Sequence, residues 1–127
     1  MNRKIIFTKD APSAIGYYSQ AIVSNNMVYT AGQIPLDPKT GEVISEDFTK
    51  QTEQTLLNIE NVLKEAGTDL TKAIKLTVFI TDLGKYPELN SVFKKTFEEA
   101  EPPARSVVQV SALPKDVQIE IDCIATL

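Results

Sequence analysis

Arg105 and Glu120 are the residues whose types most directly suggest chemistry. A guanidinium can hold a small carboxylate through two parallel hydrogen bonds, and a side-chain carboxylate can act as a base toward water. Arg105 lies at the start of a valine-rich segment, 104–110, and Glu120 lies within the alternating segment 117–124. Both segments are predicted strands, because their apolar residues recur at every second position. The turn-forming run Pro114-Lys115-Asp116 separates them.

The alternation predicts which side chains of these two strands share a face. We predict that the two segments pair as an antiparallel hairpin, in which directly opposed residues lie on the same face. Matching the apolar faces places Val108 opposite odd-numbered residues such as Ile119, and Arg105 then lies beside Glu120 on the more polar face. An exposed cross-strand ion pair, which would contribute little to stability, is the alternative interpretation. The residues alone therefore indicate either a carboxylate-binding site or a surface ion pair.

The chain of 127 residues contains no histidine and one cysteine, Cys123. Its length is that of one domain with a sizeable core. The missing histidines exclude Ser-His-Asp and Cys-His arrangements and histidine-based zinc sites, and a single cysteine excludes a Cys-rich metal site. Proton transfer would therefore use Asp, Glu, Lys, Tyr, Cys or water, and we expect no metal. Cys123 falls on the apolar face of its predicted strand, which is typical of a small buried residue in a reducing compartment.

The charge and the apolar runs restrict the partners and the location. The net charge of −4, the isoelectric point of about 4.8 and the lack of a basic run argue against nucleic acid as a partner. The first ten residues contain only three consecutive apolar positions, too few for a signal peptide, and no stretch approaches transmembrane length. We therefore expect a cytoplasmic protein with no membrane partner.

Periodic apolar residues predict two helices and about six strands. Ser45 is the expected N-cap of the first helix, Gly67 ends it, and a second helix begins at Pro87. The Asn25-Asn26 pair suits a tight hairpin between two of the early strands. The predicted strands cover residues 4–8, 21–24, 27–30, 74–81, 104–110 and 117–124. The resulting order, β-β-β-α-β-α-β-β, is typical of an α+β fold in which two helices cover one face of a mixed sheet.

The sheet face without helices is predicted to carry Phe79, Val107 and Ile124 among polar residues. An exposed face with this much apolar area is often covered by another subunit. We therefore expect a homo-oligomer in which the sheets pack toward each other.

Motifs along the whole chain resemble those of the RidA/YjgF family of small deaminases. The strongest motif runs from Pro103-Ala104-Arg105-Ser106 through Leu113-Pro114-Lys115-Asp116 to Ile119-Glu120-Ile121. The supporting motifs are Ala14-Ile15-Gly16, Tyr18-Ser19-Gln20-Ala21, Gly32-Gln33-Ile34-Pro35, Thr77-Val78-Phe79 and Asp82-Leu83. The resemblance implies a single RidA-like domain over residues 1–127 with a chorismate-mutase-like fold, assembled as a homotrimer whose sheets face a central barrel.

The resemblance also implies an activity that needs no cofactor. The implied reaction is the hydrolysis of reactive 2-imino acids such as 2-iminobutanoate and 2-iminopropanoate, which interconvert with 2-enamino acids, to 2-oxo acids and ammonia. It takes place in clefts between neighbouring subunits and protects pyridoxal-phosphate enzymes. Carried onto this chain, Arg105 would bind the substrate carboxylate and Glu120 would orient or activate water. The implied substrate-binding positions are Tyr18, Ala31, Gly32, Asn90 and Val107.

Three residues depart from the family pattern: Tyr17 replaces a common proline, Ala31 a common serine and Val107 a common cysteine. The lost hydroxyl and thiol motivate an alternative, a module that binds a small carboxylate or 2-oxo acid with little turnover. RNA cleavage or translation inhibition, reported for some relatives, is a further alternative, and the acidic composition argues against it. Burial would raise the pKa of Glu120 and a nearby Arg105 would lower it, and the sequence does not decide between them.

Overall fold

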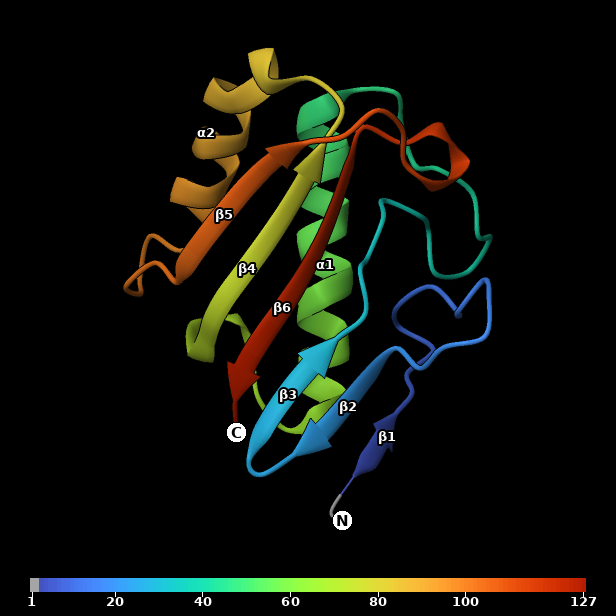
Figure 1. Ribbon diagram of the computed structural model, residues 1–127, viewed down its shortest axis with the longest axis vertical. Coiled ribbons are helices and arrows are strands. Elements are labelled where there is room, and N and C mark those ends of the chain that lie inside the picture. Colours follow the sequence, from blue (N-terminus) through green and yellow to red (C-terminus); the bar gives the residue numbers. More distant parts are fainter. Residues whose placement is uncertain (1–2) are drawn as a thin grey trace.

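The alternating apolar segments form a mixed sheet of six strands, and the two amphipathic segments form helices that pack on one of its faces (Figure 1). The computed structural model describes residues 3–127. The spatial order of the strands is β1-β2-β3-β6-β4-β5. The elements are β1 (Lys4–Ile6), β2 (Ala21–Ser24), β3 (Met27–Thr30), α1 (Phe48–Ala66), β4 (Ala73–Ile80), α2 (Tyr86–Thr96), β5 (Ala104–Gln109) and β6 (Ile119–Thr126), with short 3-10 turns at Leu70–Lys72, Leu83–Lys85 and Pro114–Asp116. The predicted α+β class and element order are confirmed.

The strand that carries Arg105 does not pair with the strand that carries Glu120. β5 pairs in parallel with β4, and β6 pairs antiparallel with the other side of β4. The predicted hairpin is therefore wrong. The reason is α2, because a helix between two strands returns the chain to the same end of the sheet and makes β4 and β5 parallel neighbours. The segment after β5 then crosses the end of β4 before β6 begins (Figure 1).

The register of the sheet also separates Arg105 from Glu120. Arg105 is paired with Leu76, which is fully buried beneath the helices, whereas Glu120 is paired with Phe79. Paired residues share a face, and alternate residues of β4 point to opposite faces. Arg105 therefore lies on the helix-covered face and Glu120 on the open face, so the predicted common face is wrong. The alternation pattern led to the wrong face for Arg105, because β5 carries a valine on each of its faces, Val107 on one and Val108 on the other.

The helix α1 begins later than predicted and ends where predicted. Asp47 is its N-cap, and its Oδ2 accepts a hydrogen bond from Lys50 N at 3.0 Å. Ser45 Oγ instead accepts from Asp47 N at 3.0 Å, so the prediction of Ser45 as the N-cap is wrong. Gly67 ends the helix in the left-handed region with φ of 96°. Of the helices in residues 3–127, none is long and apolar enough to cross a membrane.

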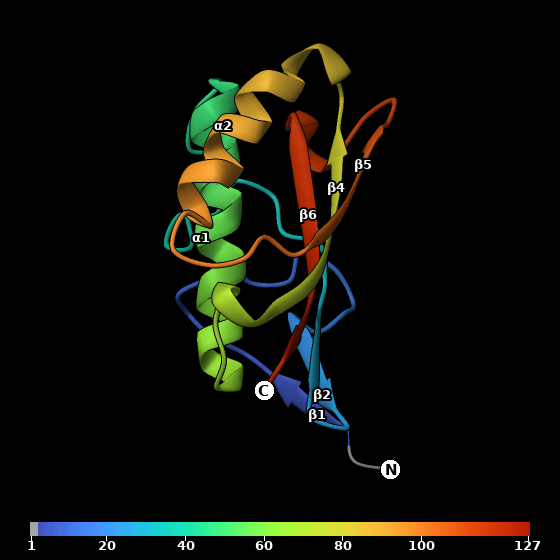
Figure 2. The ribbon, with the colours of Figure 1, turned by 90° about the vertical axis from the view of Figure 1, so that its left-hand side faces the viewer.

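Both helices lie on the same side of the sheet (Figure 2). α1 runs across the middle of the sheet and contacts β6, and it also packs against α2. The buried apolar residues of the two helices form a continuous core with the inner face of the sheet. On the helices these residues are Phe48, Leu56, Ile59, Val62, Leu63, Leu89, Val92 and Phe93.

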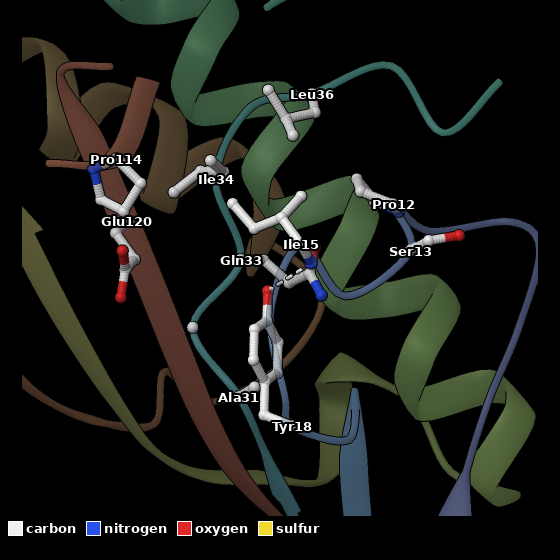
Figure 3. A pocket seen from close by; sticks show the side chains of 11 residues that line it. Pro12, Ser13, Ile15, Tyr18, Ala31, Gln33, Ile34, Leu36, Pro114 and Glu120 are labelled. Carbon is white, nitrogen blue, oxygen red and sulfur yellow. Dashed lines mark hydrogen bonds between the residues drawn. The ribbon is translucent and has the colours of Figure 1, made fainter. Parts of the chain in front are cut away.

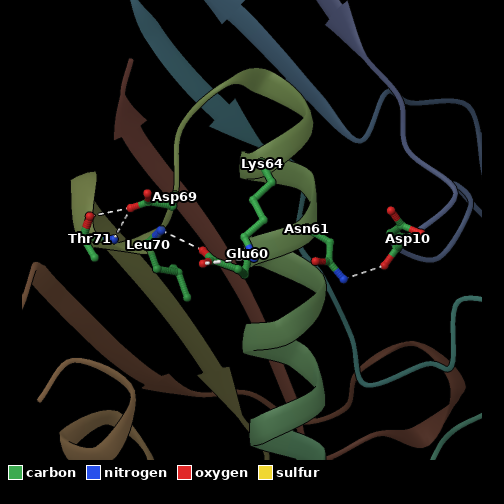
Figure 4. Close-up of polar contacts among 7 residues, drawn as sticks. All are labelled: Asp10, Glu60, Asn61, Lys64, Asp69, Leu70 and Thr71. Atoms are coloured by element: carbon green, nitrogen blue, oxygen red, sulfur yellow. Dashed lines mark hydrogen bonds and ion pairs between the residues drawn. The ribbon is translucent and has the colours of Figure 1, made fainter. Parts of the chain in front are cut away.

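Polar contacts fix the segments that flank the second half of α1 (Figure 4). Glu60 Oε2 accepts a hydrogen bond from Leu70 N at 2.7 Å, and this contact ties the segment that leads into β4 to the helix. Lys64 Nζ lies 4.0 Å from Glu60 Oε1 and forms an ion pair with it. Asn61 donates to the main-chain oxygen of Asp10 at 2.9 Å. This last contact anchors the segment between β1 and β2, which forms one wall of the site described below.

The open face of the sheet carries large apolar side chains. Phe79 and Ile124 lie on this face, as predicted, because they share it with Glu120 through the register of β4 and β6. The same register places Val108, Tyr29 and Ile5 there, with exposed fractions of 42%, 45% and 60%. This surface is apolar enough to suit contact with another protein surface.

Candidate functional site

Glu120 lines a cavity of about 300 Å³ (Figure 3). Tyr18, Ala31 and Gly32, three of the predicted substrate-binding residues, line the same cavity. Its other lining residues are Pro12, Ser13, Ile15, Gln33, Ile34, Leu36 and Pro114. A largely apolar cavity of this size with few polar groups is typical of a small-molecule site.

Gly32 lies directly against the side chain of Glu120. A Cβ atom at position 32 would overlap Oε2 of Glu120 and would lie 2.8 Å from its Cδ and 3.0 Å from its Cγ. Any larger residue would therefore displace the carboxylate. The φ angle of Gly32 is not in the left-handed region, so the close approach, and not the backbone conformation, requires glycine here.

Backbone hydrogen bonds hold Gly32 in place on both sides. Gln33 N donates to Ile121 O at 2.8 Å, and Ile121 N donates to Gln33 O at 3.0 Å. Ala31 N donates to Gln20 O at 2.9 Å. The segment after β3 is thus attached to β6 next to Ile121, and this attachment brings the neighbouring carboxylate of β6 over the glycine.

Two buried amide side chains shape the cavity walls, and neither of them was assigned a role from the sequence. Asn58 of α1 is fully buried, and its Nδ2 donates to Ile34 O and Leu36 O at 3.1 Å each. Gln20 exchanges hydrogen bonds with the main chain of Thr8, with Oε1 accepting at 2.7 Å and Nε2 donating at 3.1 Å. The available signal was an amide on the apolar stripe of α1, because a buried polar group needs hydrogen-bond partners.

Burial raises the pKa of Glu120 above its ordinary value of 4.5, and the negative charge of Asp122 raises it further. Burial also raises the pKa of Asp122, although a hydrogen bond with Thr77 and the charge of Lys75 act in the opposite direction. A raised pKa makes a carboxylate a better proton acceptor near neutral pH. Within one chain Arg105 does not offset this effect, because its guanidinium lies on the other face of the sheet.

Arg105 borders a second hollow, of about 620 Å³, between α2 and β5. Its Nη2 donates hydrogen bonds to Tyr86 Oη and to Asn90 Oδ1, both at 2.8 Å. The guanidinium carbon lies 4.9 Å from the ring centroid of Phe93, within the range of a cation–π contact. Asn90, a predicted substrate-binding residue, therefore lies with Arg105 and not with Glu120.

Val107 lines neither hollow. It pairs with Val78 on the helix-covered face and packs against the core, so the prediction that it lies on the open face is wrong. The error has the same cause as the predicted hairpin, since β5 pairs with β4 and not with β6. β5 is the last strand of the sheet, and one side of its main chain has no strand partner within residues 3–127.

The structure therefore divides the predicted site residues between two places. Tyr18, Ala31, Gly32 and Glu120 share the cavity, whereas Asn90 of α2 and Arg105 of β5 line the second hollow. Within one chain the sheet separates the two groups.

The remaining titratable and metal-binding candidates do not add to the site. Burial raises the pKa of the Cys123 thiol to about 12, so this thiol stays protonated near neutral pH. Within residues 3–127 no three His, Cys, Asp or Glu side chains are grouped so that they could hold a metal ion.

Comparisons with known proteins place this architecture in a family. A family model described as Endoribonuclease L-PSP matches residues 8–127. Reactive Intermediate Deaminase A of Arabidopsis thaliana is 43% identical over 127 residues, which cover 100% of this chain and 67% of that protein. The Rid-family protein YyfA of Yersinia pestis has a structure with a TM-score of 0.96 and 47% identity, covering 98% of this chain and 99% of that chain. The structure of E. coli TdcF with bound serine gives a TM-score of 0.93 and 46% identity, covering 98% of both chains. The chain therefore belongs to the Rid family, and the resemblance seen in its motifs is confirmed.

Proposed function

We propose that the protein hydrolyses reactive 2-imino acids, together with the 2-enamino acids in equilibrium with them, to 2-oxo acids and ammonia. Its substrates would include 2-iminobutanoate and 2-iminopropanoate, and their removal would protect pyridoxal-phosphate enzymes. The observation that carries the proposal is the half-buried carboxylate of Glu120, held against Gly32 in a cavity of about 300 Å³. A relative named Reactive Intermediate Deaminase A supports it. The serine bound to TdcF also supports it, since serine carries the carboxylate and the 2-nitrogen that such substrates share.

The proposed site lies between two copies of the chain. Arg105 of one copy and Glu120 of a neighbouring copy would face the same ligand, because the sheet separates these residues within one copy. The apolar open face, with Phe79, Ile124 and Val108, is suited to such a contact. A homotrimer whose sheets face a central barrel would contain such a site at each contact between neighbours.

Each residue would have one role in the reaction. Arg105 binds the substrate carboxylate, while Tyr18, Asn90, Ala31 and the main chain at Gly32 and Val107 enclose the substrate. The Glu120 carboxylate removes a proton from water as the water oxygen bonds to the imine carbon and the C=N electron pair moves to nitrogen. Glu120 then gives this proton to the nitrogen, takes the proton of the new hydroxyl group and passes it to the same nitrogen as the C–N bond breaks. This step releases ammonia and the 2-oxo acid and returns Glu120 to its carboxylate form. A pKa raised toward neutrality suits a group that both accepts and donates a proton.

The deciding experiment is a coupled assay with an Arg105→Ala variant. A dehydratase generates 2-iminobutanoate from threonine. The assay measures two quantities, the rate of 2-oxobutanoate release and the amount of imine that semicarbazide traps. The unaltered protein should speed oxo-acid release, and Arg105→Ala should lower kcat/KM by about 100-fold or more, because two charge-assisted hydrogen bonds are lost.

The matched control removes a different cation. Lys72→Ala, an exposed position outside both hollows, should retain full activity, and light scattering should show the same oligomer for all three proteins. An Arg105→Ala variant as active as the unaltered protein would contradict the assigned role, and no acceleration by the unaltered oligomer would contradict the proposed reaction.

Two other functions have a specific observation in their favour. The serine bound to TdcF also fits a module that binds small carboxylates with little turnover, and tight binding of 2-oxobutanoate without imine hydrolysis would establish that function here. The family description names an endoribonuclease, although the net charge of −4 argues against nucleic acid. RNA cleavage that persists through purification and is lost in Glu120→Gln would support that function instead.

A further inference from the structure

One helix holds the guanidinium of Arg105 through three of its residues. Tyr86, Asn90 and Phe93 are spaced by four and three positions, so they lie on one stripe of α2. Nη2 of Arg105 is 2.8 Å from Tyr86 Oη and 2.8 Å from Asn90 Oδ1. The guanidinium carbon is also 5.4 Å from the ring centroid of Tyr86 and 4.9 Å from that of Phe93.

These contacts leave part of the guanidinium available to a ligand. The donors on Nε and Nη1 of Arg105 make no hydrogen bond to any residue in the described part of the chain, whereas Nη2 donates to two oxygens. A long arginine side chain loses conformational freedom when it binds a ligand, and one that is already held loses less. Holding Nη2 in this way therefore prepares the other donors for binding.

The hydroxyl of Tyr86 is the part of this arrangement that packing does not explain. Tyr86 is the first residue of α2 and is 40% exposed, so its ring contributes little to the core. A phenylalanine would make the same ring contact with the guanidinium. What the hydroxyl adds is the hydrogen bond to Arg105.

We propose that Tyr86 is a positioning residue of the carboxylate site: its hydroxyl, together with the amide of Asn90, fixes the direction in which Arg105 meets the substrate. The inference rests on the proposed function, because it takes Arg105 as the anchor of a substrate carboxylate. It predicts a binding effect that is the same for every carboxylate ligand, whatever its side chain.

The test compares Tyr86→Phe with the unaltered protein in two measurements. The first is the Kd of 2-oxobutanoate by calorimetry, and the second is the pair of values kcat and KM for imine hydrolysis. We expect Kd and KM to rise by about 5- to 10-fold together, because a hydrogen bond to a charged group is lost, while kcat changes by less than about 2-fold. Imines with short and long side chains should show the same change in KM.

Two controls separate positioning from a general structural effect. Ser91→Ala removes a hydroxyl of the same helix that bonds to Pro87 O at 3.1 Å, and it should leave Kd, KM and kcat unchanged. In an Arg105→Lys background, Tyr86→Phe should have no further effect, because the two residues act through one contact.

The outcomes distinguish this inference from the proposed function. If 2-oxobutanoate binding depends on Arg105 but is unchanged in Tyr86→Phe, the positioning role is wrong and the proposed function stands. The same holds if Tyr86→Phe lowers kcat and leaves KM unaltered. If the unaltered protein does not bind 2-oxobutanoate, or if Arg105→Ala binds it with the same Kd, the role of Arg105 as the carboxylate anchor is wrong. The inference about Tyr86 then fails with it.

Discussion

Replacing Gly32 with alanine should move the Glu120 carboxylate while the protein stays folded. The added Cβ would lie 2.8 Å from Cδ of Glu120, whereas ordinary contacts begin at 3.4 Å, and it would overlap Oε2 more severely. The carboxylate must therefore retreat by on the order of 1 Å, and a misplacement of this size in a catalytic group costs about 100-fold in rate. We expect kcat/KM for 2-iminobutanoate in the coupled assay to fall by about 100-fold.

The stability of the Gly32→Ala variant should change little. Gly32 has no left-handed φ, so alanine introduces no backbone strain, and the atoms that must yield belong to one flexible side chain. Thermal unfolding should shift by less than about 4 °C, which corresponds to about 1 kcal/mol for a domain of this size. Gly16→Ala is the matched control, because the Cβ added there would have its nearest neighbour at 3.5 Å, an ordinary contact. It should retain activity within about 3-fold.

A double variant tests whether the loss acts through the carboxylate. If Glu120→Gln keeps a small residual activity, adding Gly32→Ala to it should cause no further loss, since the two changes disturb one group. Full activity of Gly32→Ala beside a strongly impaired Glu120→Gln would refute the reasoning, because the observed position of the carboxylate would then not matter for the reaction. A further loss in the double variant would show that Gly32 also acts through its main chain.

Two further predictions concern pH and stability. Glu120 must be ionised to act as a base, so kcat/KM should fall on the acidic side of its pH profile, at a pH above the ordinary pKa of 4.5. Asp122→Asn should move this acidic fall to lower pH, because it removes a negative charge that raises the pKa of Glu120. An acidic fall that stays at the same pH or moves to higher pH, after subtraction of uncatalysed hydrolysis, contradicts the assignment. Asp47→Ala should lower the free energy of unfolding by about 1 kcal/mol in urea titrations by removing the N-cap of α1, while Asp47→Asn should cost only a few tenths. Equal losses in these two variants would mean that charge, and not capping, is what Asp47 supplies.

The elements of the fold could be predicted because each one depends on a local pattern. Alternation identified the strands and a four-and-three spacing identified α1, and Gly67 ended that helix through its left-handed φ of 96°. The N-cap was misplaced by two residues, because Ser45, Glu46 and Asp47 are all polar and only the geometry shows which side chain reaches Lys50 N. The prediction that β5 pairs with β6 was wrong, because two consecutive strands can either form a hairpin or lie on opposite sides of a third strand, here β4.

The sequence indicated candidate site positions but not their arrangement, and the roles assigned to them stay predictions. The resemblance to the family implied Tyr18, Ala31, Gly32 and Glu120 as site positions, and the structure places these four around one cavity. Asn58 and Gln20 hold the walls of that cavity, and neither of them was assigned a role from the sequence, although Gln20 falls within one of the family motifs. Their roles depend on main-chain oxygens of other segments, between 8 and 24 positions away in the sequence.

The sequence by itself determined the elements, the apolar faces of β4 and β6, and the family. Those properties depend on residue type and on spacing along the chain, both of which the sequence contains. Only the tertiary structure decided that β4 lies between β5 and β6, and therefore that Arg105 and Glu120 face opposite sides of the sheet. It also decided that Tyr86 reaches the guanidinium and that Gly32 lies against the carboxylate. The physical reason is that a side chain's own strand fixes only its alternation, whereas its partners depend on which distant segments pack beside it.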